Sequence, residues 1–171
     1  MTTRPDRSEA AEYYFTYVDQ VGTGDIIDIL EAQAAETLEL FQGIPDERSL
    51  HRYAQGKWSI REVASHLTDC ERLFVFRAFW FARGFDTPLP SFDQNTAVSA
   101  AGADERPWRS HVEEFRAVRA ATLAFFRSLP PQAWTRRGIA SENPFTVRAL
   151  AYIAAGHVIH HSKSLRLRYL S

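Results

Sequence analysis

The stretch AAGHVIHHS, residues 154–162, contains three of the six histidines in this 171-residue chain. Steps of three and four residues place His157 and His161 on one helical face, which runs back through small and aliphatic residues and forward to Leu165. Two histidines one turn apart have Cβ atoms ~5–6 Å from each other, so both rings can reach one ion. The stretch therefore predicts a helix whose inward face carries apolar side chains first and then the imidazoles of His157 and His161.

Two other interpretations of this histidine pair need no metal. The rings could be hydrogen-bonded core residues, or they could form a titrating patch at the surface. A third imidazole, thiolate or carboxylate on another inward face would favour a metal site over both alternatives. A metal site therefore requires such a residue in one of the other helices.

The composition indicates one soluble domain with an apolar core, because 45% of the residues are hydrophobic and 13% are aromatic. Twenty basic residues against 21 acidic ones leave a net charge of −1, which disfavours binding to nucleic acid or to an anionic membrane. A single cysteine excludes an internal disulfide, and the polar N-terminus has no apolar signal region. We therefore expect a cytoplasmic protein. Its most apolar run, residues 73–82, is much shorter than the ~20 residues of a membrane span.

The third inward ligand lies in a helix that is expected to begin at Ser59. This serine and Glu62 have the spacing of a capping box. The inward face of the helix then places His66 where a core helix normally has leucine, and Cys70 follows one turn later on the same side. Asp69 lies between them in the sequence. His66 is therefore the third candidate ligand for the pair on the last helix.

Four amphipathic helices account for most of the chain. Apolar residues recur at helical spacing in four segments: residues 25–42, 59–84, 108–129 and 146–170. Some twenty residues without this pattern separate the second helix from the third, enough to carry the chain back along a whole bundle. Residues 130–145 are expected to form a loop with a short extended piece. The predicted fold class is therefore all-α, a four-helix bundle with one long crossover between helices two and three, in a single domain over residues 1–171.

Three other features carry no catalytic signal. Residues 1–24 are rich in aromatic side chains and are expected to form an N-terminal arm laid over the body. His51 lies in the connection before the second helix, and His111 lies off the apolar stripe of the third. Both histidines are expected at the surface.

Several short motifs, in their order and spacing, resemble the DinB-like superfamily in its YfiT-like (DinB_2) branch. They are KWSIREV at residues 57–63, His66-Leu67, Asp69, Glu71-Arg72, Arg77, FDQN at residues 92–95, TVR at residues 146–148, and Gly156-His157 with His161. The resemblance extends from about residue 25 to residue 170. It implies a four-helix bundle with one crossover, often dimeric, that holds a divalent metal on three histidines.

Carried over residue by residue, the resemblance implies His66, His157 and His161 as the metal ligands, the same three residues that the helical faces indicate. Three imidazoles leave the coordination shell open for water or a substrate thiol. The set suits zinc or nickel first, with manganese or iron as alternatives. The metal centre is therefore expected to be of the open, catalytic kind.

The resemblance also bears on function, because some relatives are thiol-dependent enzymes, including bacillithiol S-transferases and mycothiol-dependent isomerases. A bound dication would lower the pKa of a coordinated thiol, which is the chemical basis of thiol transfer. The expected function is a metal-dependent transferase that uses a low-molecular-weight thiol. The alternatives are a non-catalytic metal-binding stress-response protein and a plain helical scaffold whose histidines satisfy one another.

Four further residues are candidates for roles around the metal. His160 is turned about 100° from His161 on the helix and is expected beside the ligands or at an interface. Cys70 is either a small buried residue or a fourth ligand. Asp69 either orients an imidazole through its free N–H or points to solvent. Asn95, on the crossover, either covers the open face of the metal or serves a turn.

Except at Arg77, residues 73–81 are apolar on every side of the expected helix. A helix in a bundle needs only one apolar face for packing against its neighbours. A second copy of the chain is the expected cover for this run. The crossover or the N-terminal arm are the alternatives. A homodimer is therefore expected.

Overall fold

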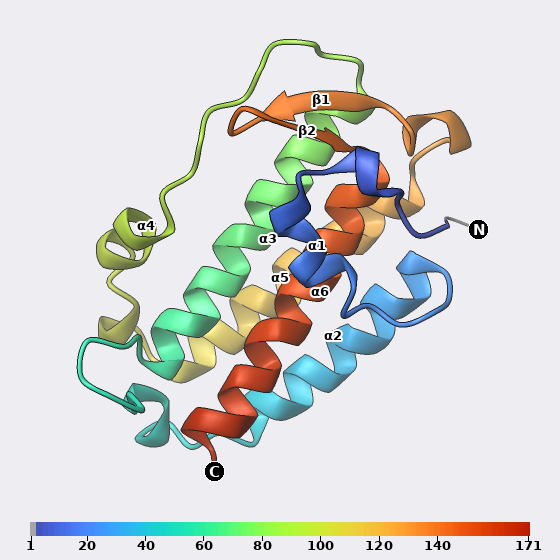
Figure 1. The fold of residues 1–171 in the computed structure, drawn as a ribbon. Helices are drawn as coiled ribbons and strands as arrows, with labels where there is room; N and C mark the ends of the chain where they lie inside the picture. Colours follow the sequence, from blue (N-terminus) through green and yellow to red (C-terminus); the bar gives the residue numbers. More distant parts are fainter. Residues whose placement is uncertain (1–2) are drawn as a thin grey trace.

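The computed structural model describes residues 3–171 and places nearly half of them in four long helices (Figure 1). These helices are α2 (Ile26–Gln42), α3 (Ile60–Ala82), α5 (Trp108–Arg127) and α6 (Val147–Ser164), the last extended by a π-helical turn, Leu165–Tyr169. The bounds agree with the segments that the apolar periodicity predicts. The first two residues of the predicted arm lie outside the described residues.

Local signals in the sequence explain where the helices begin. The carboxylate of Asp25 accepts a hydrogen bond from the N–H of Ile27 at the start of α2. Ser59 and Glu62 form the predicted capping box at the start of α3. Thr146 caps α6 by accepting from the N–H of an alanine three residues later. Side-chain oxygens thus satisfy N–H groups that have no partner within these helices.

The helices form a ring in which α3 contacts α6 and α5, and α2 contacts the same two helices from the other side. In Figure 1, α3 and α5 run in one direction while α2 and α6 run in the other. Because α3 and α5 are parallel, the chain must return along the bundle between them, as predicted. The crossover carries a short helix, α4 (Gln94–Ala100), and a 3₁₀ turn, Ala103–Glu105.

The connection between α5 and α6 is a β-hairpin, where the sequence indicated only a loop with an extended piece. Strands β1 (Arg137–Ala140) and β2 (Asn143–Thr146) pair antiparallel, and Leu89 of the crossover bridges to β1. A Cβ at Gly138 would collide with the ring of Phe81 near the end of α3. The hairpin therefore lies directly over one end of the bundle (Figure 1).

A buried polar network joins all four helices. The Arg119 guanidinium on α5 donates two 2.7 Å hydrogen bonds to the Glu71 carboxylate on α3 and one of 2.9 Å to the side-chain oxygen of Gln33 on α2. The amide of Gln33 in turn donates to the carbonyl of Ala155 on α6 at 2.9 Å. Apolar periodicity does not reveal this network, because it consists of polar side chains at core positions.

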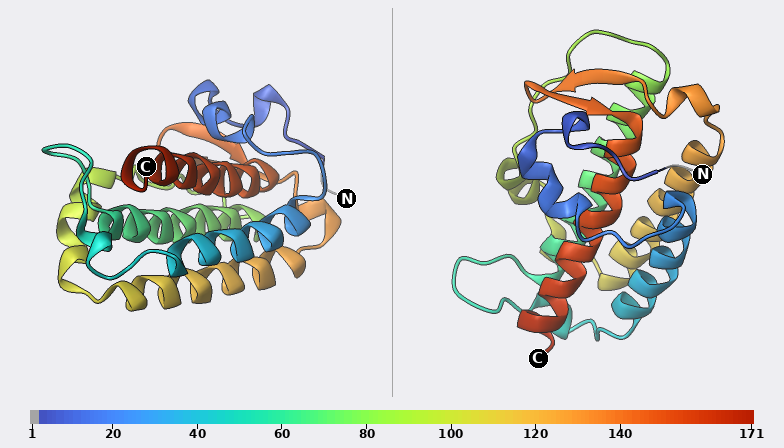
Figure 2. Two further views of the ribbon diagram at one scale, coloured as in Figure 1. Left: turned by 90° about the horizontal axis from the view of Figure 1, so that it is seen from below. Right: turned by 45° about the vertical axis from the view of Figure 1, so that its right-hand side comes forward.

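The N-terminal arm packs on α6, as Figure 2 shows from two sides. Its helix α1 (Phe15–Val18) crosses α6 at Gly156, where an added Cβ would overlap the backbone of Tyr17. Glu9, which is buried, pairs with Arg148 near the start of α6. The arm is therefore held by both a close backbone contact and a partly buried ion pair.

The structure corrects the expectation about one of two histidines. His111 is buried, and its Nε2 lies 2.9 Å from the carbonyl oxygen of Ala103 in the crossover. His51 is only partly exposed, and its backbone carbonyl accepts a hydrogen bond from the N–H of Ile60. The expectation that both lie at the surface was wrong for His111, because the crossover covers that side of α5.

The apolar run on α3 is covered only in part. Trp80 stacks on Phe85 with ring centroids 4.2 Å apart, and its indole N–H donates to the carbonyl of Thr87. Phe76 and Phe79 keep 48% and 37% of their surface exposed. The start of the crossover thus covers one of the aromatic residues and leaves two open. No helix among residues 3–171 has the length and apolar character needed to cross a membrane.

We predict that Gly156→Ala destabilises the protein by about 1–3 kcal/mol, because the new methyl group must displace the backbone of Tyr17. Urea denaturation measures the free energy of unfolding. Gly22→Ala is the matched control, since nothing lies within 4 Å of a Cβ at that exposed position. Equal stabilities for the two variants would contradict a close contact between α1 and α6.

Candidate metal centre

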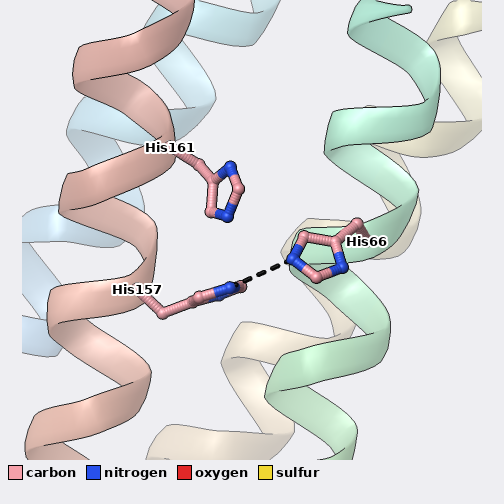
Figure 3. A group of neighbouring side chains, drawn as sticks. All are labelled: His66, His157 and His161. Atoms are coloured by element: carbon pink, nitrogen blue, oxygen red, sulfur yellow. Dashed lines mark hydrogen bonds between the residues drawn. The ribbon is translucent and has the colours of Figure 1, made fainter. Parts of the chain in front are cut away.

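Three histidines from two antiparallel helices converge near the middle of the bundle (Figure 3). His66 comes from α3, and His157 and His161 come from successive turns of α6. One ring nitrogen from each lies within 4.8 Å of the others, and Nε2 of His66 is 3.1 Å from Nε2 of His157. The tertiary structure therefore brings together the three residues that the sequence selected.

Burial keeps these imidazoles neutral. It lowers the pKa of His66 to about 4 and that of His161 to about 3. The pKa of His157 is also lowered, first by burial and then by the neighbouring histidines. At neutral pH each ring therefore has an unprotonated nitrogen, which is the form that binds metals.

The donor set fits a divalent transition metal. Two imidazole nitrogens bound to one zinc ion at ~2.0–2.1 Å lie about 3.3 Å apart in a tetrahedral shell, and the two Nε2 atoms of His66 and His157 are already 3.1 Å apart. One shared proton can make a hydrogen bond between His66 and His157 but leaves His161 without one from this pair. The ring of His161 lies with its centroid 4.9 Å from that of His66 and 4.6 Å from that of His157. These three side chains could hold a metal ion.

Aromatic rings surround the histidines. Trp58 packs against His66 with centroids 4.9 Å apart, and Phe74 lies 5.7 Å from His157. Tyr17 of α1 stands edge-on to His157 at 5.2 Å. No pattern in the sequence of the arm predicted a role at the site. The signal that could have found Tyr17 was Gly156, a glycine inside a helix next to a candidate ligand, which indicates a close backbone approach.

Cys70 lies beside the triad but does not join it. Its Sγ is 3.5 Å from Nδ1 of His66, and burial raises the pKa of the thiol to about 12. Cys70 is also not among the residues whose ligand atoms all lie within 4.8 Å of one another, a group made up of the three histidines alone in the described part of the chain. Cys70 therefore contacts one face of the His66 ring and lines the adjoining cavity.

The other candidates take different positions. Asp69 accepts a hydrogen bond of 3.1 Å from Arg72, so its carboxylate pairs with a guanidinium rather than with an imidazole. His160 is exposed and stands edge-on to Tyr17 and His161. His160 is thus next to the triad and outside it.

Two cavities reach the histidines, and Asn95 of α4 lines both. The first has a volume of about 320 Å³ and is bounded by the arm, α3 and the crossover, with His157 in its wall. The second, of about 360 Å³, is bounded by residues 53–58 and the end of α6, with His160 and His161 in its wall. Asn95 is therefore a wall residue common to the two cavities.

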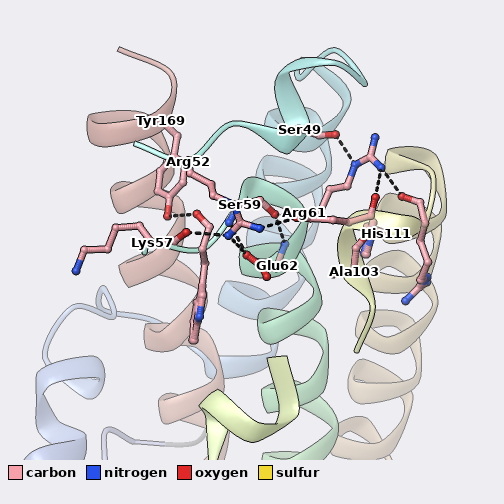
Figure 4. Close-up of polar contacts among 12 residues, drawn as sticks. Ser49, Arg52, Lys57, Ser59, Arg61, Glu62, Ala103, His111 and Tyr169 are labelled. Atoms are coloured by element: carbon pink, nitrogen blue, oxygen red, sulfur yellow. Dashed lines mark hydrogen bonds and ion pairs between the residues drawn. The ribbon is translucent and has the colours of Figure 1, made fainter. Parts of the chain in front are cut away.

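Polar contacts at the end of the bundle hold Trp58 in place (Figure 4). Arg52 donates to the carbonyl of Lys57 at 2.8 Å and pairs with Glu62. The hydroxyl of Tyr169 donates to the carbonyl of Trp58 at 3.0 Å. These contacts secure the segment on both sides of the indole, so the wall of the second cavity is rigidly connected to α3 and α6.

An all-α bundle with a three-histidine centre between α3 and α6 defines the class of this protein. The chain belongs to the DinB superfamily, whose sequence pattern matches residues 29–164. No curated protein matches the sequence.

Two solved structures share the fold. YfiT from Bacillus subtilis, described as a probable metal-dependent hydrolase with an unusual four-helix bundle topology, superposes with a TM-score of 0.73 at 17% identity, over 96% of this chain and 90% of that chain. A mycothiol-dependent maleylpyruvate isomerase superposes with a TM-score of 0.70 at 11% identity, over 82% of this chain and 59% of that chain. At these identities the likeness establishes the fold alone.

We predict that the metal-free protein loses stability as the pH falls from about 6.5 towards 4. The unfolded chain binds a proton at His66 in this window and the folded chain does not, because burial lowers the folded pKa to about 4. The expected loss between pH 7 and pH 5 is about 2 kcal/mol per buried histidine. Urea denaturation of chelator-treated protein measures it. His66→Gln should show a smaller loss, and an unchanged loss in that variant would contradict a neutral buried His66.

Proposed function

We propose that this protein is a metal-dependent enzyme that transfers a low-molecular-weight thiol to a small electrophile. The observation that carries the proposal is a group of three neutral imidazoles that two separate cavities reach, one at His157 and the other at His161. A centre of this kind offers one side to a thiol and the other to its reaction partner. A structural metal site would instead be closed by a fourth protein ligand.

His66, His157 and His161 would hold the ion, with zinc or nickel as the first choices and manganese or iron as the next. A divalent ion bound there would supply Lewis acidity towards a thiol or a carbonyl oxygen. Tyr17 lines the first cavity, and its hydroxyl, which lies 3.1 Å from that of Tyr13, is a protonated hydrogen-bonding group at neutral pH, with a pKa that burial raises further. Trp58 and Phe74 restrict the access of water to the rings.

Each related structure supports a different part of the proposal. The Bacillus subtilis protein is described as metal-dependent, and the isomerase is described as dependent on the thiol mycothiol. The first description also favours a second candidate, hydrolysis, in which water takes the place of the thiol. We place the activity in the cytoplasm, where small thiols are kept reduced.

The test uses nickel-loaded protein, because thiolate binding to nickel produces a visible absorption band. We predict that titration with 2-mercaptoethanol changes the spectrum of the wild-type protein and that ethylene glycol does not. His66→Ala, His157→Ala and His161→Ala should each lose most of the metal, since a missing ligand removes a bond and the geometry of the others.

His160→Ala is the matched control for metal binding and should keep the nickel, because His160 lies outside the triad. Stoichiometric nickel with no thiol response would leave hydrolysis or a non-catalytic metal-binding protein. Metal retained in all three ligand variants would overturn the metal site itself.

We also propose a homodimer formed through the apolar patch of Phe76 and Phe79 on α3. Light scattering at micromolar concentration should give the mass of two chains. Phe79→Glu should give one chain, because a carboxylate would be buried in the interface. Leu167→Glu is the control, since Leu167 is 65% exposed at the other end of the molecule. A monomeric wild-type protein would contradict the dimer.

A further inference from the structure

Arg77 of α3 is a buried cation without a carboxylate partner. Only 2% of its surface is exposed. Its Nη2 donates to the carbonyl of Pro90 at 3.2 Å and to the hydroxyl of Ser141 at 2.8 Å, both neutral acceptors. Its buried Nε has no hydrogen-bond partner within residues 3–171. A guanidinium remains charged even where burial lowers its pKa, so this charge is present at neutral pH.

The other buried arginines of the described chain are matched by acids. Arg119 forms a two-pronged ion pair with Glu71, and Arg61 pairs with Asp46 at 2.8 Å. Within residues 3–171, no carboxylate lies within ion-pair distance of Arg77. Buried charges are normally paired, because an unpaired one loses its hydration without compensation. The charge of Arg77 is therefore available to an anion that enters from outside.

Such an anion can enter, because Arg77 lines the 320 Å³ cavity that also reaches His157. Five aromatic residues, among them Tyr14, Tyr17 and Phe74, line the cavity together with polar side chains such as Gln94 and Ser141. The aromatic rings suit an apolar body, and the guanidinium suits a charged group at one end.

One acid, Asp93, also lines this cavity. Its carboxylate accepts a 2.6 Å hydrogen bond from the N–H of Thr96 and caps α4. That hydrogen bond, and not Arg77, is the principal cause of the lowered pKa of Asp93. Asp93 therefore does not neutralise the guanidinium.

We propose that this cavity binds a small carboxylic acid with an apolar body, whose carboxylate pairs with Arg77 and whose body lies against the tyrosine rings towards His157. In the proposed function, this acid is the electrophile that reacts with the thiol. That role, but not the binding of the acid, rests on the proposed function. The binding of the acid depends only on Arg77 and the cavity. The second cavity remains free for the thiol.

Benzoate is the probe, and benzyl alcohol is its uncharged counterpart of nearly the same shape. Calorimetric titration of the full chain should show benzoate binding that is reduced about 10- to 100-fold in Arg77→Gln, the range expected for a lost charge-assisted hydrogen bond. Benzyl alcohol should bind the wild-type protein and the variant equally. Arg116→Gln is the matched control, because Arg116 is an exposed arginine on α5. Benzoate binding that is unchanged in Arg77→Gln would overturn the proposal.

A second measurement does not depend on the folding of that variant. Benzoate should shift the Nε–H resonance of Arg77 in the wild-type protein, assigned by its absence in Arg77→Lys, and benzyl alcohol should not. No shift with benzoate would overturn the proposal.

Benzoate titrations of the protein with and without bound metal distinguish a failure of the Arg77 site from a failure of the proposed enzymatic function. If benzoate binding is lost with a chelator and kept in Arg77→Gln, the acid binds the metal and the Arg77 site is wrong. If the protein binds no metal but benzoate binding still depends on Arg77, the proposed enzyme fails and the carboxylate site stands.

Discussion

The ion pair between Arg119 and Glu71 is the interaction on which the rest of the bundle depends. A buried guanidinium without its carboxylate would be strongly destabilising, so α3 and α5 can pack only in the alignment that joins them. Gln33 extends the same constraint to α2 and, through the carbonyl of Ala155, to α6. A shift of one helix by a single turn, ~5.4 Å, would break every one of these contacts. The network therefore selects one alignment of four helices whose apolar faces alone would tolerate several.

That alignment sets the geometry of the histidine centre. Ala155 is two residues before His157, and Glu71 is five residues after His66, so both helices are held within about 8 Å of the triad along their axes. The rings can then be buried as neutral ligands before any ion arrives. Four long helices with their own core are expected to fold without a metal, in contrast to a small zinc domain. The centre is thus available for chemistry.

The connections between the helices determine what reaches the centre. The crossover returns along the bundle, and its Asn95 lines both cavities that reach the histidines. The arm closes the first cavity from the other side and is held close by Gly156. Because these segments contribute Tyr17 and the acceptors around Arg77, the selectivity of the site resides largely outside the four helices.

The sequence by itself determined the helices, their caps, the long crossover and the three inward histidines, because periodicity and capping depend on residues within one helix. The four-residue spacing was enough to place His157 and His161 on one helical face. A histidine at a core position of an apolar stripe was enough to identify His66 as a candidate ligand. Only the tertiary structure decided that Arg119 finds Glu71, that His111 is buried and that Tyr17 stands beside the triad. Those contacts join elements far apart in the chain, and their partners are selected by how the helices pack, which no local pattern records.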